Sequence, residues 1–158
     1  MQQLRAVVRA TRSQNWCGPT AIAALTGLTY DESSEAIRKF SRRRKVTGTT
    51  SWEVLSVLKK CGYTKQTTIR PRDDEGKLLT FNQYLRRRGD LEKSNPILIN
   101  AGHHWIVVLR NKAICSLTRS QPVKISEYKH KKVRVKNVNV LERTKKPTKA
   151  ELRQVLGI

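Results

Sequence analysis

Residues 17–27 read CGPTAIAALTG, and the interpretation of the whole chain starts from this stretch. Pro19 stands where the first turn of a helix tolerates a missing N–H group, and Gly27 stands where a helix commonly ends. The Ala, Ile and Leu residues between them make the segment apolar along its whole length. We therefore predict a buried helix that begins close to Cys17.

Three further segments before residue 97 have helical spacing. Asp31 is expected to cap a helix over residues 32–40. Thr50 or Ser51 is expected to begin a third helix. This helix would bury an apolar face made of Trp52, Leu55 and Leu58. A fourth, short helix is expected from Thr80, as its cap, to Gly89, where it would close.

The hydrophobic period then changes from helical to alternating. Residues 110–112 are expected to form a tight hairpin between two apolar strands. The last strand alternates Val with polar residues, which predicts one solvated face, and the step from Val135 to Val138 predicts a bulge. The expected strands cover residues 97–99, 103–109, 113–117 and 131–141. Helices followed by an antiparallel sheet predict the α+β class.

The length of 158 residues favours one domain. We expect its core over about residues 14–141 and a basic extension over residues 142–158. Thr148 and Glu151 have the spacing of a capping box, which predicts a terminal helix that ends at Leu156.

Two short motifs carry reactive side chains. Cys17 opens the first predicted helix, where unpaired N–H groups and the helix dipole favour a thiolate. His103 and His104 begin the strand that continues as WIVVL. A thiolate is the nucleophile of acyl transfer, an imidazole can shuttle its proton, and the Cys17 N–H could donate to the oxyanion. Together these residues indicate a Cys–His pair.

The chain resembles the papain-like cysteine peptidases. Cys-Gly-Pro-Thr at a helix start, followed far downstream by Gly-His-His-Trp-Ile-Val-Val, looks most like their compact bacterial and phage members, which are related to the bacteriocin-processing peptidase domains of peptide exporters. The resemblance covers about residues 14–118. It implies a helical half that carries Cys17 and an antiparallel sheet that carries the catalytic His. His104 is preferred to His103, because in the family the His is followed by an aromatic or aliphatic residue and then by valines.

The chain departs from the family at two positions. The resemblance implies an Asp or Asn on the next strand, which would orient the imidazole, but hairpin counting gives Cys115 or Ser116 there. It also implies an oxyanion-hole Gln about six residues before the Cys. Here Gln14 is only three residues before it, and Asn15 is another amide donor. The resemblance therefore predicts catalytic roles for Cys17 and His104, with Ser116 and Gln14 as the candidate supporting residues.

The chain carries 33 Lys and Arg against 12 Asp and Glu, a net charge of +21. Such an excess favours a polyanionic partner. We expect DNA or RNA contact through basic clusters, without sequence preference, and few aromatic residues interleave with them to stack on bases. The candidate contact residues are Arg42, Arg43, Arg44, Lys45, Arg86, Arg87, Arg88, Lys131 and Lys132.

Two functions are weighed on these grounds. The first is a cysteine peptidase or amidohydrolase that acts on a peptide or protein substrate. The second is a catalytically reduced protein of the same fold, for example in a phage virion, that binds nucleic acid. A membrane-surface role of the terminal helix ranks last, because that helix is short and mildly amphipathic.

Further classes are excluded by patterns that the sequence lacks. The three cysteines include no CxxC pair, so neither a zinc ribbon nor any other metal or cofactor is expected. No apolar run reaches the ~18–20 residues of a membrane span. No signal peptide is recognised. We expect a cytoplasmic or virion-associated protein.

Overall fold

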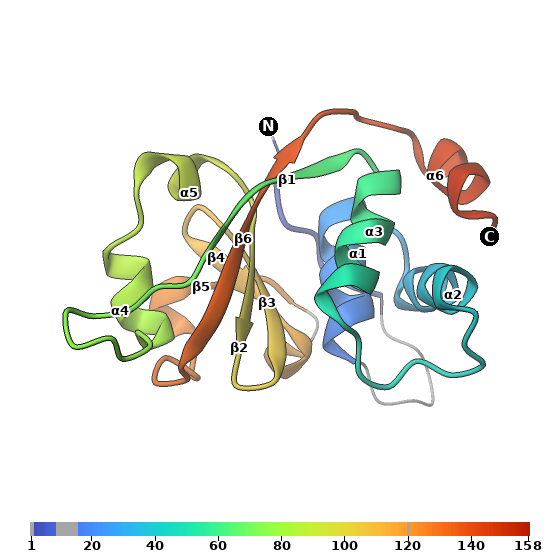
Figure 1. Ribbon diagram of the computed structural model, residues 1–158. Coiled ribbons are helices and arrows are strands. Elements are labelled where there is room, and N and C mark those ends of the chain that lie inside the picture. Colours follow the sequence, from blue (N-terminus) through green and yellow to red (C-terminus); the bar gives the residue numbers. More distant parts are fainter. Residues whose placement is uncertain (1, 9–15, 120) are drawn as a thin grey trace.

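The computed structural model describes residues 2–8, 16–119 and 121–158 (Figure 1). Within them the α-helices are α1 (Cys17–Thr26), α2 (Tyr30–Ser41), α3 (Ser51–Lys60), α4 (Phe81–Arg86), α5 (Asp90–Ser94) and α6 (Lys149–Leu156). The strands are β1 (Tyr63–Ile69), β2 (Ile97–Ala101), β3 (His104–Leu109), β4 (Lys112–Ile114), β5 (Val123–Lys124) and β6 (Val135–Arg143). Two 3-10 helices are η1 (Ser116–Thr118) and η2 (Ile125–Glu127).

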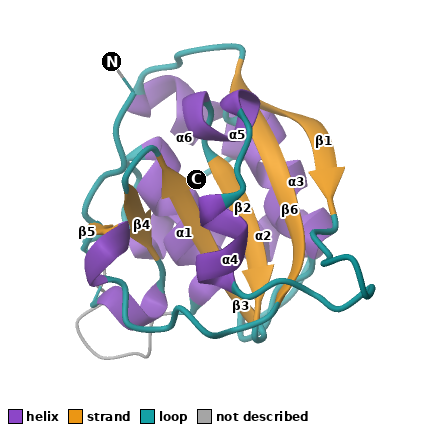
Figure 2. Cartoon of the chain, turned by 90° about the vertical axis from the view of Figure 1, so that its left-hand side faces the viewer, coloured by secondary structure: helices purple, strands orange, loops and turns teal. Residues whose placement is uncertain are grey.

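The described strands form one sheet in the order β1-β6-β2-β3-β4-β5, and every neighbouring pair is antiparallel. Helices α1, α2, α3 and α6 lie on one side of it, while α4 lies on the other (Figure 1). Figure 2 views the sheet from the side of α4, with α1, α2 and α3 behind it. The α+β class with N-terminal helices and an antiparallel sheet is confirmed.

Two hydrophobic cores share this sheet, because alternate residues of a strand point to opposite faces. The first core lies between the sheet and the four helices, and β3 contributes Trp105 and Val107 to it. The second core lies beneath α4, and β3 contributes Ile106 and Val108. Strands in the middle of the sheet are thus buried on both faces.

The second helix begins earlier than the sequence predicted. Its cap is Thr29, not Asp31, and the helix starts at Tyr30. The Thr29 hydroxyl accepts from the Glu32 N–H at 3.1 Å, and the Glu32 carboxylate accepts from the Thr29 N–H at 2.9 Å. This reciprocal pair satisfies two donors where Asp31 as the cap would satisfy one.

The predicted buried face of the third helix is wrong at Trp52. The helix begins after Thr50 as predicted, and Leu58 is fully buried. Trp52 is 67% exposed, however, because Val54 and Val57 fill the face that meets the sheet. The exposed indole packs on Phe40 of α2 with 4.7 Å between ring centroids.

The fourth helix is capped by Thr80 as predicted, but Gly89 does not close it. Helix α4 ends at Arg86, and Gly89 is instead the N-terminal cap of α5. The Glu92 carboxylate accepts from the Gly89 N–H at 2.7 Å, which fixes the start of this additional short helix.

Strand β4 is shorter than the predicted strand over residues 113–117. It stops at Ile114, and Ser116 opens η1. The Cys115 sulfur accepts from the Leu117 N–H at 3.3 Å, and the Thr118 hydroxyl accepts from the Cys115 N–H at 3.3 Å. These side chains take backbone donors that a continuing strand would present to its neighbour.

The last strand begins four residues later than predicted, at Val135, and its solvated face is absent. Its residues Val138 to Leu141 are buried on both faces, because β1 and β2 flank the strand and a core covers each side. The predicted bulge is confirmed, since the register with β2 skips Lys136.

The terminal helix follows Thr148 as predicted, and the Thr148 hydroxyl accepts from the Glu151 N–H. Leu152 and Leu156 are buried in the first core, and Arg153 forms an ion pair at 2.6 Å with Glu32 of α2. The basic segment at the end of the sequence is therefore packed on the helical layer.

Candidate active site

Cys17 is the first residue of α1 and is partly buried at the edge of the first core. The turn is fixed by Thr20, whose hydroxyl donates to the Trp16 carbonyl at 2.8 Å. Gly18 lies against Thr49 of the α2–α3 loop, and a Cβ on Gly18 would lie 2.2 Å from the Thr49 Oγ1 atom. The loop before α3 therefore closes over the start of α1.

Trp105 of β3 connects this loop to the thiol. Its indole Nε1–H donates to the Thr49 carbonyl at 3.3 Å, and its ring is buried in the first core. Its backbone N–H lies close enough to the Cys17 thiol to lower the pKa of that thiol. Strand β4 pairs only with Val107 to Leu109, so β3 has no neighbouring strand on that edge at Trp105. The Trp105 N–H thus faces the thiol at an edge of β3 that no other described strand covers.

The surroundings of Cys17 shift the pKa of its thiol in two opposite directions. Burial raises the pKa of the thiol above its usual value. The N–H groups of Trp105, Cys17 and Gly18 lower it in part, without overcoming burial. The N–H groups at the helix start thus act in the expected direction, but burial outweighs them. A base is needed to take the proton.

His104 is the first residue of β3 and precedes Trp105 in the chain, so its main chain lies next to the Cys17 thiol. By strand alternation its side chain belongs to the face of Ile106 and Val108, opposite to Trp105. No hydrogen bond joins the imidazole to the thiol in the described part of the chain, so a Cys17–His104 pair requires the imidazole to turn past the open edge of β3. Burial lowers the pKa of His104, and the charges of His130 and His103 lower it further. The imidazole is therefore kept neutral, the form that can accept a proton.

His103 differs from His104 in backbone and exposure. Gly102 and His103 form the two-residue turn between β2 and β3, and both have positive φ, 55° and 64°. His103 is exposed at this turn. The structure thus places His104 in the strand beside Trp105 and His103 at the tip of the hairpin.

The supporting residues proposed from the sequence have different surroundings. Cys115 is fully buried, and its sulfur lies 3.4 Å from the Tyr128 hydroxyl in the second core. Ser116 is partly buried at the start of η1, outside the strand where the orienting residue was expected. Gln14, like Asn15, lies outside the described residues.

His130 is a neighbour of the site that sequence reasoning missed. Its ring meets Tyr128 edge-on, with 5.8 Å between centroids, and its charge acts on His104. His130 also helps to line a pocket of about 310 Å³ with Tyr128, Leu117 and Val123. Nothing in the run KHKK at residues 129–132 distinguishes this His from a solvated one.

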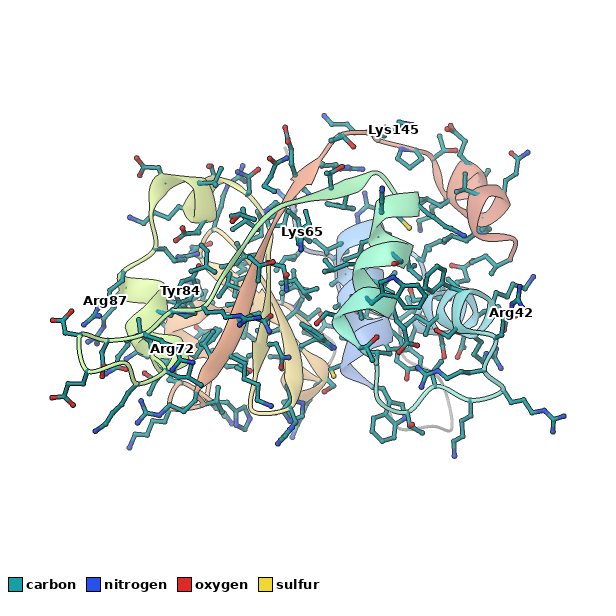
Figure 3. The ribbon with its side chains drawn as sticks, viewed as in Figure 1. Arg42, Lys65, Arg72, Tyr84, Arg87 and Lys145 are labelled. Carbon is teal, nitrogen blue, oxygen red and sulfur yellow. The ribbon has the colours of Figure 1, made fainter. Side chains whose placement is uncertain are left out.

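The basic residues do not gather into one patch. Arg42 and Arg87 lie at opposite ends of the molecule (Figure 3). Arg43 pairs with the buried Glu53 at 2.7 Å, and Arg88 donates to the carbonyls of Leu85 and Arg110, so both have structural partners. The other proposed contact residues are exposed or partly exposed, namely Arg42, Arg44, Lys45, Arg86, Arg87, Lys131 and Lys132.

Comparisons with known proteins identify no relative that would assign a role to this site. No family model, curated protein or solved structure matches the chain. Within residues 2–8, 16–119 and 121–158, no group of three or more His, Cys, Asp or Glu side chains could hold a metal ion. In the same part of the chain, every helix is too short or too polar to cross a lipid bilayer. The site is therefore interpreted from its own residues.

Proposed function

We propose that the protein is a cysteine hydrolase of the papain-like kind, acting on a peptide or related amide. One observation carries this proposal: the Cys17 thiol at the start of α1 lies close to the backbone N–H of Trp105, the residue that follows His104. That contact unites the two motifs that lie 87 residues apart in the sequence (104 − 17).

The proposed reaction starts from a protonated Cys17 thiol and a neutral His104 imidazole. The neutral His104 imidazole takes the proton of the Cys17 thiol, and the resulting thiolate attacks the amide carbon. The Cys17 N–H donates to the oxygen that becomes negatively charged. As the C–N bond breaks, the imidazolium returns its proton to the leaving nitrogen. Water then hydrolyses the thioester, which releases the acid and restores the thiol.

The test is the pH dependence of Cys17 alkylation by iodoacetamide, followed by mass spectrometry of the Cys17 peptide. In the wild type, proton transfer from the thiol to the neutral His104 imidazole should allow Cys17 to react at about neutral pH. In His104→Ala, the reactivity should appear only at a pH above the ordinary range of a thiol, about 8.5, because burial raises the pKa of Cys17. His103→Ala is the matched control and should retain the wild-type profile. Identical profiles in all three proteins would refute the Cys–His pair.

A second candidate function, nucleic-acid binding without sequence preference, is supported by the net charge of +21 and by exposed Arg and Lys residues at both ends of the molecule (Figure 3). Packaging beside nucleic acid in a virion is one setting that would suit it. Affinity for duplex DNA should fall by orders of magnitude between about 50 and 200 mM salt. No binding even at the lower salt concentration would exclude this candidate.

A further inference from the structure

The most exposed aromatic side chain among the described residues lies on α3, next to the residue Glu53 that pairs with Arg43 of the first basic cluster. Trp52 is 67% exposed on α3, while the ring of Phe40 supports it from α2 at an interplanar angle of 50°. The contact with Phe40 restricts the indole yet leaves much of its surface in solvent. An indole held in this way is available to a flat ligand.

A groove of about 470 Å³ begins at Trp52 and runs between α3 and β1. Leu55 supplies apolar surface, and hydroxyl groups and two lysines line the rest. The groove is lined by Ser51, Trp52, Leu55, Ser56, Lys59, Tyr63, Thr64 and Lys65. Figure 3 labels Lys65 on the face of the molecule where α3 and β1 lie in front.

The charged residues that line this groove are lysines, while Glu142 of β6 stands opposite Thr64 and accepts from Gln66 of β1. Lys59 and Lys65 line it, and Lys60 stands beside it with its ammonium nitrogen 5.5 Å from the Phe40 ring centroid. No Asp or Glu is among the described residues that line the groove. The acid nearest in sequence to Trp52 is Glu53, which is buried and paired with Arg43. The lysines at the groove are thus without an acidic partner among these residues.

The edge strand beside the groove is accessible as well. Residues 64–68 of β1 are all exposed, and β1 pairs on one side only, with β6. An extended polymer can therefore follow the groove past Lys65 without meeting a wall formed by another strand.

We propose that this groove binds single-stranded nucleic acid. A base stacks on the Trp52 indole, and Lys59 and Lys65 contact the phosphates that follow. Single-strand sites combine a basic groove with an aromatic side chain in this manner. An acidic peptide would satisfy the lysines but would have no specific use for an exposed indole. The inference rests on the second candidate function and gives it a specific site, whereas it is independent of the chemistry at Cys17.

The experiment measures binding of a fluorescently labelled oligothymidylate of about 12 nucleotides, a length within the range that such sites occupy. Trp52→Leu should weaken binding by about 5- to 150-fold, the loss expected for one stacked base. Trp52→Phe keeps an aromatic face and should recover most of the affinity. Because both variants keep an apolar side chain against Phe40, their melting temperatures serve as the check on folding.

The lysines are tested through salt dependence. Lys59→Gln and Lys65→Gln should each reduce the slope of log affinity against log salt by about 0.7, one phosphate contact on a single strand. Arg72→Gln, an exposed residue at the other end of the molecule and outside the proposed contact clusters (Figure 3), is the matched control and should leave the slope unchanged.

The outcomes separate this inference from the function on which it rests. Absence of binding to both duplex DNA and the oligonucleotide would overturn both. Oligonucleotide binding that is unchanged in Trp52→Leu would overturn the groove and leave the basic clusters as the binding surface. Binding of polyglutamate with the same dependence on Trp52, and no binding of oligothymidylate, would reassign the groove to an acidic peptide.

Discussion

Cys17 and Cys61 both contact the first core, but they lie at opposite ends of their helices. Cys17 opens α1, and N–H groups surround its partly buried sulfur. Cys61 follows the last residue of α3 and is 2% exposed. Burial alone raises the pKa of Cys61 to about 12. The same side chain thus becomes a candidate nucleophile at one helix end and inert packing at the other.

The largest expected difference between the two cysteines is their rate of alkylation. At pH 8, Cys17 should react with iodoacetamide at least about 100-fold faster than Cys61, because burial and a high pKa deprive Cys61 of thiolate. Peptide mass spectrometry after timed quenching measures both rates in one sample. Comparable rates would remove the distinction between the two sites.

The glycines that follow the two cysteines should tolerate Ala differently. Gly62 has φ +94°, and its Cβ would lie 2.7 Å from the backbone carbonyl oxygen of Lys145, so Gly62→Ala should cost about 2–3 kcal/mol of stability. Gly18 has no positive φ, and its neighbour is the Thr49 side chain. Gly18→Ala should cost about 1–3 kcal/mol through overpacking.

Thr49→Ala tests whether the Thr49 side chain causes the stability loss expected in Gly18→Ala. Among the described residues the Thr49 hydroxyl is buried without a hydrogen-bond partner, so its removal is inexpensive. The double variant Gly18→Ala, Thr49→Ala should recover part of the lost stability in urea melts, because the Cβ of residue 49 still lies 2.9 Å from the new Cβ, whereas the same Thr49 change should not help Gly62→Ala. Additive losses in the first pair would show that strain at Gly18 does not come from Thr49.

The next largest effect is the loss of folding stability that Cys61 should cause at alkaline pH. The folded protein keeps the Cys61 proton up to about pH 12, whereas the unfolded chain loses it near about pH 8.5. Above that lower value the unfolded state binds fewer protons, so stability falls as pH rises, by up to about 1.4 kcal/mol per pH unit. From pH 8.5 to 10, wild type should therefore lose about 2 kcal/mol relative to Cys61→Ala, as followed by urea melts. Parallel pH profiles would contradict the high pKa of Cys61.

The smallest effect on folding stability is expected from the titration of His104. Its pKa is lowered in the folded state by burial and by His130 and His103. The unfolded state therefore binds the proton first, and stability should fall as pH drops below about 6.5. His104→Gln should flatten this acid-side loss in thermal melts between pH 5 and 7. His130→Gln should raise the pKa of His104 in an NMR titration, and an unchanged His104 titration would remove His130 from the site.

The sequence predicted the elements whose signals are local. Thr50, Thr80 and Thr148 all cap helices because each has a Glu or Gln three residues later, and the strands around residues 97–109 are continuous apolar runs. Strand β1 was missed because its exposed residues TKQTT have neither alternation nor apolar content. It owes its position to pairing with β6, whose residues lie 69 to 80 positions further along the chain.

The candidate site also contains some residues that local sequence motifs indicate and others that they do not. Cys17 and His104 could be chosen from short motifs, and whether they act as a pair stays a prediction. The contact of Cys17 with the Trp105 N–H depends on where β4 ends, which local hydrogen bonds of Cys115 and Thr118 decide. His130 has no sequence signal, since only folding brings it near His104. The exposure of Trp52 depends on which face α3 turns to the sheet.

The shared sheet has a consequence for cooperativity. In β2, Leu98 packs in the first core while Ile97 and Ile99 pack in the second, so neither core can loosen without disturbing the strand that both require. Local opening is then confined to elements that join only one side or one edge, such as β1 and β5. Amides at the centre of β2 should exchange with solvent only when the whole molecule unfolds, and the α1 end and the α4 end should melt in a single transition.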